Sequence, residues 1–258
     1  QENMERSYEN LQLEEKDLTE LVIEYNHCKG QESLVCKESL PWSKISIGVS
    51  ASLNYSTLHV KRPERPWIVN GIRLNEMYEY MSETYTLMYT EAGLVFTFMS
   101  PRKHERLSVR SGLYFNKSEY KAHVDLETRY TIESHDTYIN LATLSIPFSI
   151  VYAIPLGKYS LSVQPGIQCQ YFLKNDTRVL GEIINIYAPD INKDDIAFEM
   201  YKFTIGSSCG LAIARSFKNF TMETMVKHNY FPDYNKEEGL KVLNSNIGIS
   251  FIISPSFK

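Results

Sequence analysis

Apolar and polar residues alternate along eight segments of this chain between residues 44 and 253. In the first segment Ile45, Ile47 and Val49 share one parity, while Ser46 and Gly48 share the other. Successive side chains point to opposite faces of a β-strand, so this pattern predicts strands with one apolar and one polar face. The apolar positions of the other seven segments are Ala92, Leu94, Phe96, Phe98; Leu107, Val109, Leu113, Phe115; Ala142, Leu144, Ile146, Phe148, Ile150, Tyr152; Tyr159, Leu161, Val163, Ile167, Cys169, Tyr171, Leu173; Tyr201, Phe203, Ile205, Cys209, Leu211, Ile213; Phe220, Met222, Val226, Tyr230; and Ile247, Ile249, Phe251, Ile253.

The connections between these segments alternate between long and short. The short joints are residues 100–106, 155–158 and 216–219, and the long polar ones are residues 61–83, 123–138, 174–199 and 232–241. Transmembrane β-barrels of bacteria have an even number of strands, short periplasmic turns and long outer loops. We therefore predict an all-β fold over residues 44–258: an eight-stranded, antiparallel, up-and-down transmembrane β-barrel.

A soluble lipocalin-like barrel that binds a small apolar ligand is the alternative, with the apolar face turned inward. The polar face favours the membrane barrel, because it is rich in small uncharged residues such as Ser160, Ser162 and Thr204, whereas a water-facing surface is normally rich in Lys and Glu. The apolar face carries almost no charge, with Lys117 as the exception. A charge facing lipid at mid-bilayer costs about 2 to 4 kcal/mol.

Charged residues of both signs share the polar phase of the strands. We expect them to pair inside the narrow lumen that eight strands enclose. The predicted interior polar network consists of Glu91, Arg110, Lys202, Glu223 and Lys227.

The composition argues against several other classes of function. The net charge is -4 and no cluster of Lys and Arg stands out, so nucleic acid is not an expected partner. No apolar run approaches the roughly 20 residues of a membrane helix. The 18 tyrosines include several near the expected strand ends, where aromatic girdles would place them.

Residues 1–43 do not follow the strand pattern and are predicted to be a periplasmic segment with one short helix. Asp17 and Glu20 resemble a capping box, and Leu18, Leu21, Val22 and Tyr25 share one helical face. Cys28 and Cys36 flank a short polar stretch and are a candidate disulfide in an oxidising periplasm, with two free thiols as the alternative. Cys169 and Cys209 fall in the apolar phase of neighbouring strands, as small hydrophobic residues or as a cross-strand bond.

The chain shows no strong sign of a metal, cofactor or catalytic site. His27 beside Cys28 and Cys36 is too loosely spaced for a convincing metal site. Asp190, Asn192 and Asp194 begin like a calcium loop, but Asp195 and Tyr201 stand where Gly and Glu are required. GxSxG, HExxH and Walker motifs are absent. We expect no cofactor and no enzymatic activity, with an outer-membrane enzyme whose site assembles at the barrel rim as an alternative.

Several short motifs resemble an outer-membrane β-barrel family often labelled porin-like or PorT-like, over about residues 43–258. They are Gly93-Leu94-Val95-Phe96, Ser111-Gly112-Leu113-Tyr114-Phe115, Leu144-Ser145-Ile146-Pro147-Phe148, Gln164-Pro165-Gly166-Ile167, the Pro155-Leu156-Gly157-Lys158 turn and Tyr171-Phe172-Leu173. The resemblance implies a Gram-negative outer-membrane protein that contacts outer-membrane lipid and the barrel-assembly machinery, and it offers no catalytic residues. One departure is that Phe257 is penultimate and Ser254-Pro255 interrupts the alternation before it.

These observations predict a structural or surface-binding role through the long outer loops, with the lumen closed by polar side chains. Residues 174–199 are the best candidate for contact with an external protein or glycan, because apolar side chains occur there in an otherwise polar connection. The candidate contact residues are Ile183, Ile184, Ile186 and Tyr187.

Overall fold

The chain divides into two compact units, Gln1–Leu40 and Pro41–Lys258. The computed structural model describes residues 22–23, 25–27, 29, 43–61, 68–69, 72–73, 84–101, 104, 106–127, 131–185, 191–236 and 240–255. In the first unit, residues 22–23 and 25–27 are helical, while Leu18 and Leu21 of the predicted helix face lie outside the described residues. No helix among the described residues is long and apolar enough to cross a membrane.

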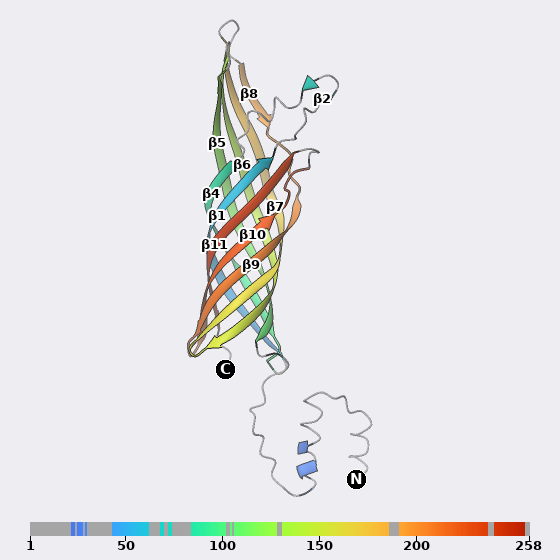
Figure 1. Ribbon diagram of the computed structural model, residues 1–258, viewed down its shortest axis with the longest axis vertical. Helices are drawn as coiled ribbons and strands as arrows, with labels where there is room; N and C mark the ends of the chain where they lie inside the picture. Colours follow the sequence, from blue (N-terminus) through green and yellow to red (C-terminus); the bar gives the residue numbers. More distant parts are fainter. Residues whose placement is uncertain are drawn as a thin grey trace. The chain divides into compact units, whose positions relative to one another are not determined.

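Eight strands of the second unit form a closed ring of antiparallel neighbours (Figure 1). The ring closes because β1 pairs with β11 and β6 pairs with β7. Neighbours in the ring follow one another along the chain, which confirms the predicted eight-stranded up-and-down barrel. Its strands are β1 (Lys44–Lys61), β4 (Thr84–Met99), β5 (Leu107–Glu127), β6 (Thr131–Leu156), β7 (Tyr159–Asn185), β9 (Phe203–Ser216), β10 (Phe220–Phe231) and β11 (Lys241–Pro255).

The three short joints lie where the sequence predicts them, at one end of the barrel. β4 ends at Met99 and β5 begins at Leu107, and β9 ends at Ser216 before β10 begins at Phe220. The joint between β6 and β7 is a two-residue turn in which Gly157 has a φ of 64°. This left-handed conformation matches the twist of a tight hairpin and favours glycine.

Two of the predicted long connections are largely strand, which corrects the sequence interpretation. β5 and β6 continue as a hairpin through residues 123–138, and β7 continues to Asn185. A further strand, β8 (Ile191–Ile196), pairs with the last part of β7. β5, β6, β7 and β8 therefore form a four-stranded sheet that extends beyond the barrel (Figure 1), and a small hairpin joins β2 (Ile68–Val69) to β3 (Ile72–Arg73).

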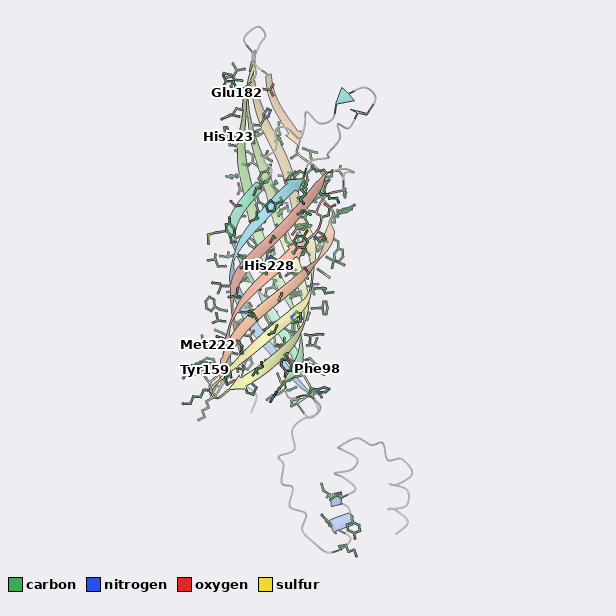
Figure 2. All side chains as sticks on the ribbon, viewed as in Figure 1. Phe98, His123, Tyr159, Glu182, Met222 and His228 are labelled. Atoms are coloured by element: carbon green, nitrogen blue, oxygen red, sulfur yellow. The ribbon has the colours of Figure 1, made fainter. Side chains whose placement is uncertain are left out.

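The apolar face of the barrel points outward and the polar face points inward. Phe98, Tyr159 and Met222 project from the barrel wall in Figure 2, and each is more than a third exposed. Ser50, Asn54 and similar polar residues are buried instead. A soluble carrier requires the opposite orientation, so the lipocalin-like alternative is wrong, and the surface is that of a membrane-spanning barrel.

The height of the apolar belt follows from β5. Its outward apolar positions run from Leu107 to Phe115, and the next outward positions are Lys117, Glu119 and Lys121. Nine tilted residues at about 3.3 Å each span about 25 Å, the thickness of the apolar band of such barrels. Exposed tyrosines such as Tyr55, Tyr159 and Tyr171 agree with the expected aromatic girdles, whereas Tyr89 and Tyr120 face the interior.

Candidate functional site

The interior of the barrel, toward the end with the short joints, contains a buried ion pair between Arg110 on β5 and Glu223 on β10. The Arg110 guanidinium donates two hydrogen bonds to the Glu223 carboxylate, from Nη1 to Oε1 at 2.5 Å and from Nη2 to Oε2 at 2.8 Å. Gln164 on β7 donates a third bond to the same carboxylate at 2.9 Å, and Arg110 Nε donates to Thr97 Oγ1 on β4 at 3.2 Å. These contacts cross-link strands from opposite walls through side chains that are only 12% and 10% exposed.

A second buried ion pair joins Lys227 on β10 to Glu91 on β4. Ser52 donates a hydrogen bond to Glu91, and the Lys227 ammonium lies 5.2 Å from the ring centre of Tyr114. Each cation of the two pairs has one anion, so the four charges balance. Balanced, hydrogen-bonded pairs are the form in which charges are tolerated in a low-dielectric interior.

The structure thus brings together four of the five residues of the predicted interior network: Glu91, Arg110, Glu223 and Lys227. The prediction that Lys202 belongs to the interior network is wrong, because this residue is exposed and precedes β9, which begins at Phe203. Its backbone carbonyl accepts a hydrogen bond from Phe172 N at 2.9 Å, outside the regular ladder. The parity of a strand does not extend past its end, so Lys202 does not face the lumen.

A layer of amide and hydroxyl groups lies next to the ion pairs. Ser56 shares a hydrogen bond of 2.8 Å with the Tyr120 hydroxyl, and Asn244 donates to Ser56 at 3.0 Å. The Asn229 amide donates to Asn246 at 2.8 Å. Because these groups come from β1, β5, β10 and β11, they hold the two sides of the closed ring together.

Hydrophobic residues fill the loop end of the lumen, which the sequence did not predict. Phe198 and Met200 come from the segment after β8 and are 1% and 3% exposed. Thr177 Oγ1 donates to the Phe198 carbonyl at 2.6 Å, and the ring of Tyr234 meets that of Phe172 edge-on at 5.2 Å. We call this cluster the apolar plug; it comprises Leu58, Val60, Tyr85, Tyr120, Ile139, Leu141, Phe172, Ala197, Phe198, Met200, Phe231, Tyr234, Leu240 and Val242.

The interior leaves little free space. A cavity of about 30 Å³ lies beside Arg110, Gln164 and Lys227, and another of about 10 Å³ lies among Asn116 and Tyr120. A buried water needs at least about 10 to 15 Å³, so the larger cavity holds one or two waters and the smaller one water at most. Among the described residues, the lumen is therefore closed to solutes by ion pairs, by the amide layer and by the apolar plug.

The four-stranded sheet beyond the barrel contains two of the four predicted contact residues, Ile183 and Ile184. Ile184 is on β7 and is 46% exposed, and Ile183 is the neighbouring residue of the same strand. Ile186 and Tyr187 lie outside the described residues. His123 and Glu182 are labelled on this part of the sheet in Figure 2.

The outward edge of the sheet carries a histidine between two carboxylates. His123 Nδ1 lies 2.8 Å from Asp136 and Nε2 lies 3.0 Å from Asp125. These hydrogen bonds raise the pKa of His123 above its ordinary value because they favour the charged imidazolium. The bond to Asp136 has the larger effect on the pKa.

The remaining candidates carry little chemistry. Cys169 and Cys209 are free thiols whose ladder partners are Ile205 and Pro165, so the two cysteines do not oppose each other. Cys28, Cys36 and Asp190 lie outside the described residues. No group of three or more His, Cys, Asp or Glu residues suited to a metal ion occurs in the described part of the chain.

Comparison with known proteins found no matching family model and no curated protein of similar sequence. Three solved structures illustrate the structural likeness. Neisserial surface protein A has 9% identity over 81% of this chain and 98% of its own, with a TM-score of 0.39. The attachment invasion locus protein Ail of Yersinia pestis has 11% identity over 80% and 97%, with a TM-score of 0.24. The outer membrane protein OprG of Pseudomonas aeruginosa has 10% identity over 83% and 95%, with a TM-score of 0.31. Similarity at this level carries no information about function.

Proposed function

We propose that this protein is a bacterial outer-membrane barrel that binds an external protein through the sheet formed by β5, β6, β7 and β8. The outward apolar belt supports insertion in a bilayer, and the filled lumen argues against transport. In bacterial barrels the short turns face the periplasm. By that rule the N-terminal unit is periplasmic and the tip of the extended sheet lies outside the cell.

The observation that carries the proposal is a group of exposed aliphatic side chains on the part of the sheet that stands above the belt, on a face that also carries charged residues such as Asp136 and Glu182. Ile132 and Ile184 are cross-strand partners and are 51% and 46% exposed. Leu180 and Ile196, at 42% and 66% exposed, lie on the same face. Lipid does not reach this height, so we infer that these exposed aliphatic side chains contact a partner.

We favour a protein over a glycan as the partner because aliphatic side chains are exposed on this face beside charged ones, and burial of exposed aliphatic side chains is typical of contacts between proteins. A second feature agrees with a polypeptide ligand: among the described strands, none pairs with the outer edge of β5 beyond Asn116. Free backbone N–H and C=O groups on such an edge are complementary to another extended chain.

Proteoliposomes containing the full chain, tested on a panel of immobilised secreted proteins and glycans, would examine this function. We expect binding to at least one protein, and we expect Ile184→Asp to reduce it at least tenfold. Thr86→Asp is the matched control, because it adds the same charge at an exposed outward position of β4, outside the extended sheet. Binding to glycans alone, or equal binding by the two variants, would contradict the proposal.

Other expectations from the sequence remain predictions. They are membership of the PorT-like family, recognition by the barrel-assembly machinery and the absence of enzymatic activity. Product release from defined peptide or phospholipid substrates by the purified barrel would overturn the last of these.

A further inference from the structure

The outer wall of the barrel is hollowed where β4 and β5 separate. Their ladder runs from Met99 and Ser108 to Glu91 and Asn116, and among the described residues it ends there. β4 continues to pair with β1, and β5 continues to pair with β6. A cavity of about 500 Å³ lies at this fork, within the usual range of small-molecule sites.

The shape of the hollow follows from one row of the barrel wall. Phe251, Ala51, Ala92 and Phe115 are consecutive partners on β11, β1, β4 and β5, and all four point outward. Neighbouring strands are about 4.8 Å apart. Two alanines therefore form a floor between two phenylalanine walls, which makes an apolar groove on the lipid-facing surface.

Lys117 adds a positive charge at one end of this groove. It lines the cavity, is exposed and forms no ion pair with another described residue. It is also the first charged outward residue of β5 after the apolar position Phe115, so it lies at the boundary between the apolar belt and the polar exterior. A lysine at this height can place its ammonium at the level of lipid headgroups.

The inward-facing residues at the fork belong to the lumen. Asn116 is 4% exposed, alternates with the outward residues Phe115 and Lys117, and also lines the small interior cavity beside Tyr120. Glu91 also lines the groove, but its ion pair with Lys227 neutralises its charge toward an incoming anion.

The geometry points to a binding site for one anionic, phosphate-bearing lipid of the surrounding membrane. Its acyl chain lies over Ala51 and Ala92 between the two phenylalanines, and its phosphate pairs with Lys117. This site lies on the barrel wall and does not depend on the protein ligand proposed for the extended sheet.

Native mass spectrometry of the full chain in detergent, titrated with dioleoyl phosphatidylglycerol, tests the site. We expect Lys117→Gln to weaken binding about fivefold, the effect of one lysine close to an anionic lipid. Ala92→Phe should weaken binding by a similar factor, because it fills the groove while keeping the charge. Dioleoyl phosphatidylcholine, which has the same chains and no net charge, should bind more weakly than phosphatidylglycerol.

Lys121→Gln is the matched control, since Lys121 occupies the same face of β5 outside the groove and is paired with Glu119. We expect this variant to bind phosphatidylglycerol like the wild type. Equal loss in Lys117→Gln and Lys121→Gln would indicate only general attraction to the surface and would overturn the site. Wild-type binding by Ala92→Phe would overturn it as well. Electrophoretic mobility with and without boiling identifies any variant that has not folded, and Lys117→Met then replaces a failed Lys117→Gln.

Discussion

At the scale of single residues, the two buried ion pairs are the features on which the interior depends most. Each joins strands that are far apart in the chain, and among the described residues each cation has only one carboxylate. Loss of one partner leaves the other charge buried without compensation, which is much more costly than loss of an exposed pair. The sequence predicted these residues correctly through strand parity, but it could not predict which cation meets which anion, since parity contains no information on register.

Glu223→Ala should lower the free energy of unfolding by about 3 to 5 kcal/mol, because it leaves the Arg110 guanidinium buried in the barrel without its carboxylate partner. Unfolding in guanidinium with the protein in phospholipid vesicles measures the change. Glu119→Ala is the control, since its ion pair with Lys121 is exposed and should contribute less than about 1 kcal/mol. Equal effects of the two substitutions would contradict the assigned role of the buried pair.

His123 gives the extended sheet a dependence on pH. Its pKa is raised in the folded state by Asp136 and then by Asp125. The stabilisation is fully present below the pKa of the unfolded chain, about 6.5, and is lost as the pH rises through the higher folded-state pKa. An NMR titration should give His123 a pKa above 6.5, and Asp136→Asn should lower it. A pKa that stays the same in Asp136→Asn would contradict this coupling; Asp176→Asn, on the same sheet, should leave it unchanged.

At the scale of elements, strand ends were harder to predict than strands. Beyond Phe115, β5 keeps its alternation, but its outward residues become Lys117, Glu119 and Lys121. A pattern without an apolar face suggests a loop, although the β5–β6 pairing continues to Glu127. Hydrogen bonds to neighbouring strands therefore extend the sheet where burial in lipid does not require it.

The apolar plug could not be predicted, because Phe198 and Met200 follow no repeating pattern and come from a stretch that reads as a polar connection. Its residues meet only after the barrel has brought β1, β6, β7 and β11 together. Phe198→Ala should cost about 3 to 5 kcal/mol, the usual effect of removing a fully buried phenylalanine. Unfolding in vesicles checks this value. Phe217→Ala, at an exposed position in a short turn, should cost less, and a cost as large as that of Phe198→Ala would contradict the role of the plug.

At the scale of the whole molecule, the protein is a barrel with an apolar exterior and an interior filled by side chains. Planar bilayers containing the wild type should therefore show no stable conductance steps. Phe198→Ala should also show no conductance steps, because the two ion pairs still close the lumen between the plug and the short joints. Reproducible conductance from the wild type would contradict a closed lumen.

The strand count and the outward direction of the apolar face were both predictable, because lipid imposes one period on every strand. The ligand of the extended sheet was not, since its surface combines residues such as Ile132 and Ile184 from different strands. Their proximity depends on the register of β6 and β7, which alternation does not specify.

The most direct test compares two adjacent residues of β5. In a chain whose two tryptophans, Trp42 and Trp67, are replaced by phenylalanine, a single tryptophan is placed at Phe115, which points outward, or at Tyr114, which is 6% exposed. With vesicles that contain brominated lipids, we expect strong quenching of fluorescence for Phe115→Trp and little for Tyr114→Trp. Equal quenching at the two positions, or stronger quenching at Tyr114→Trp, would contradict a barrel whose apolar face meets the membrane.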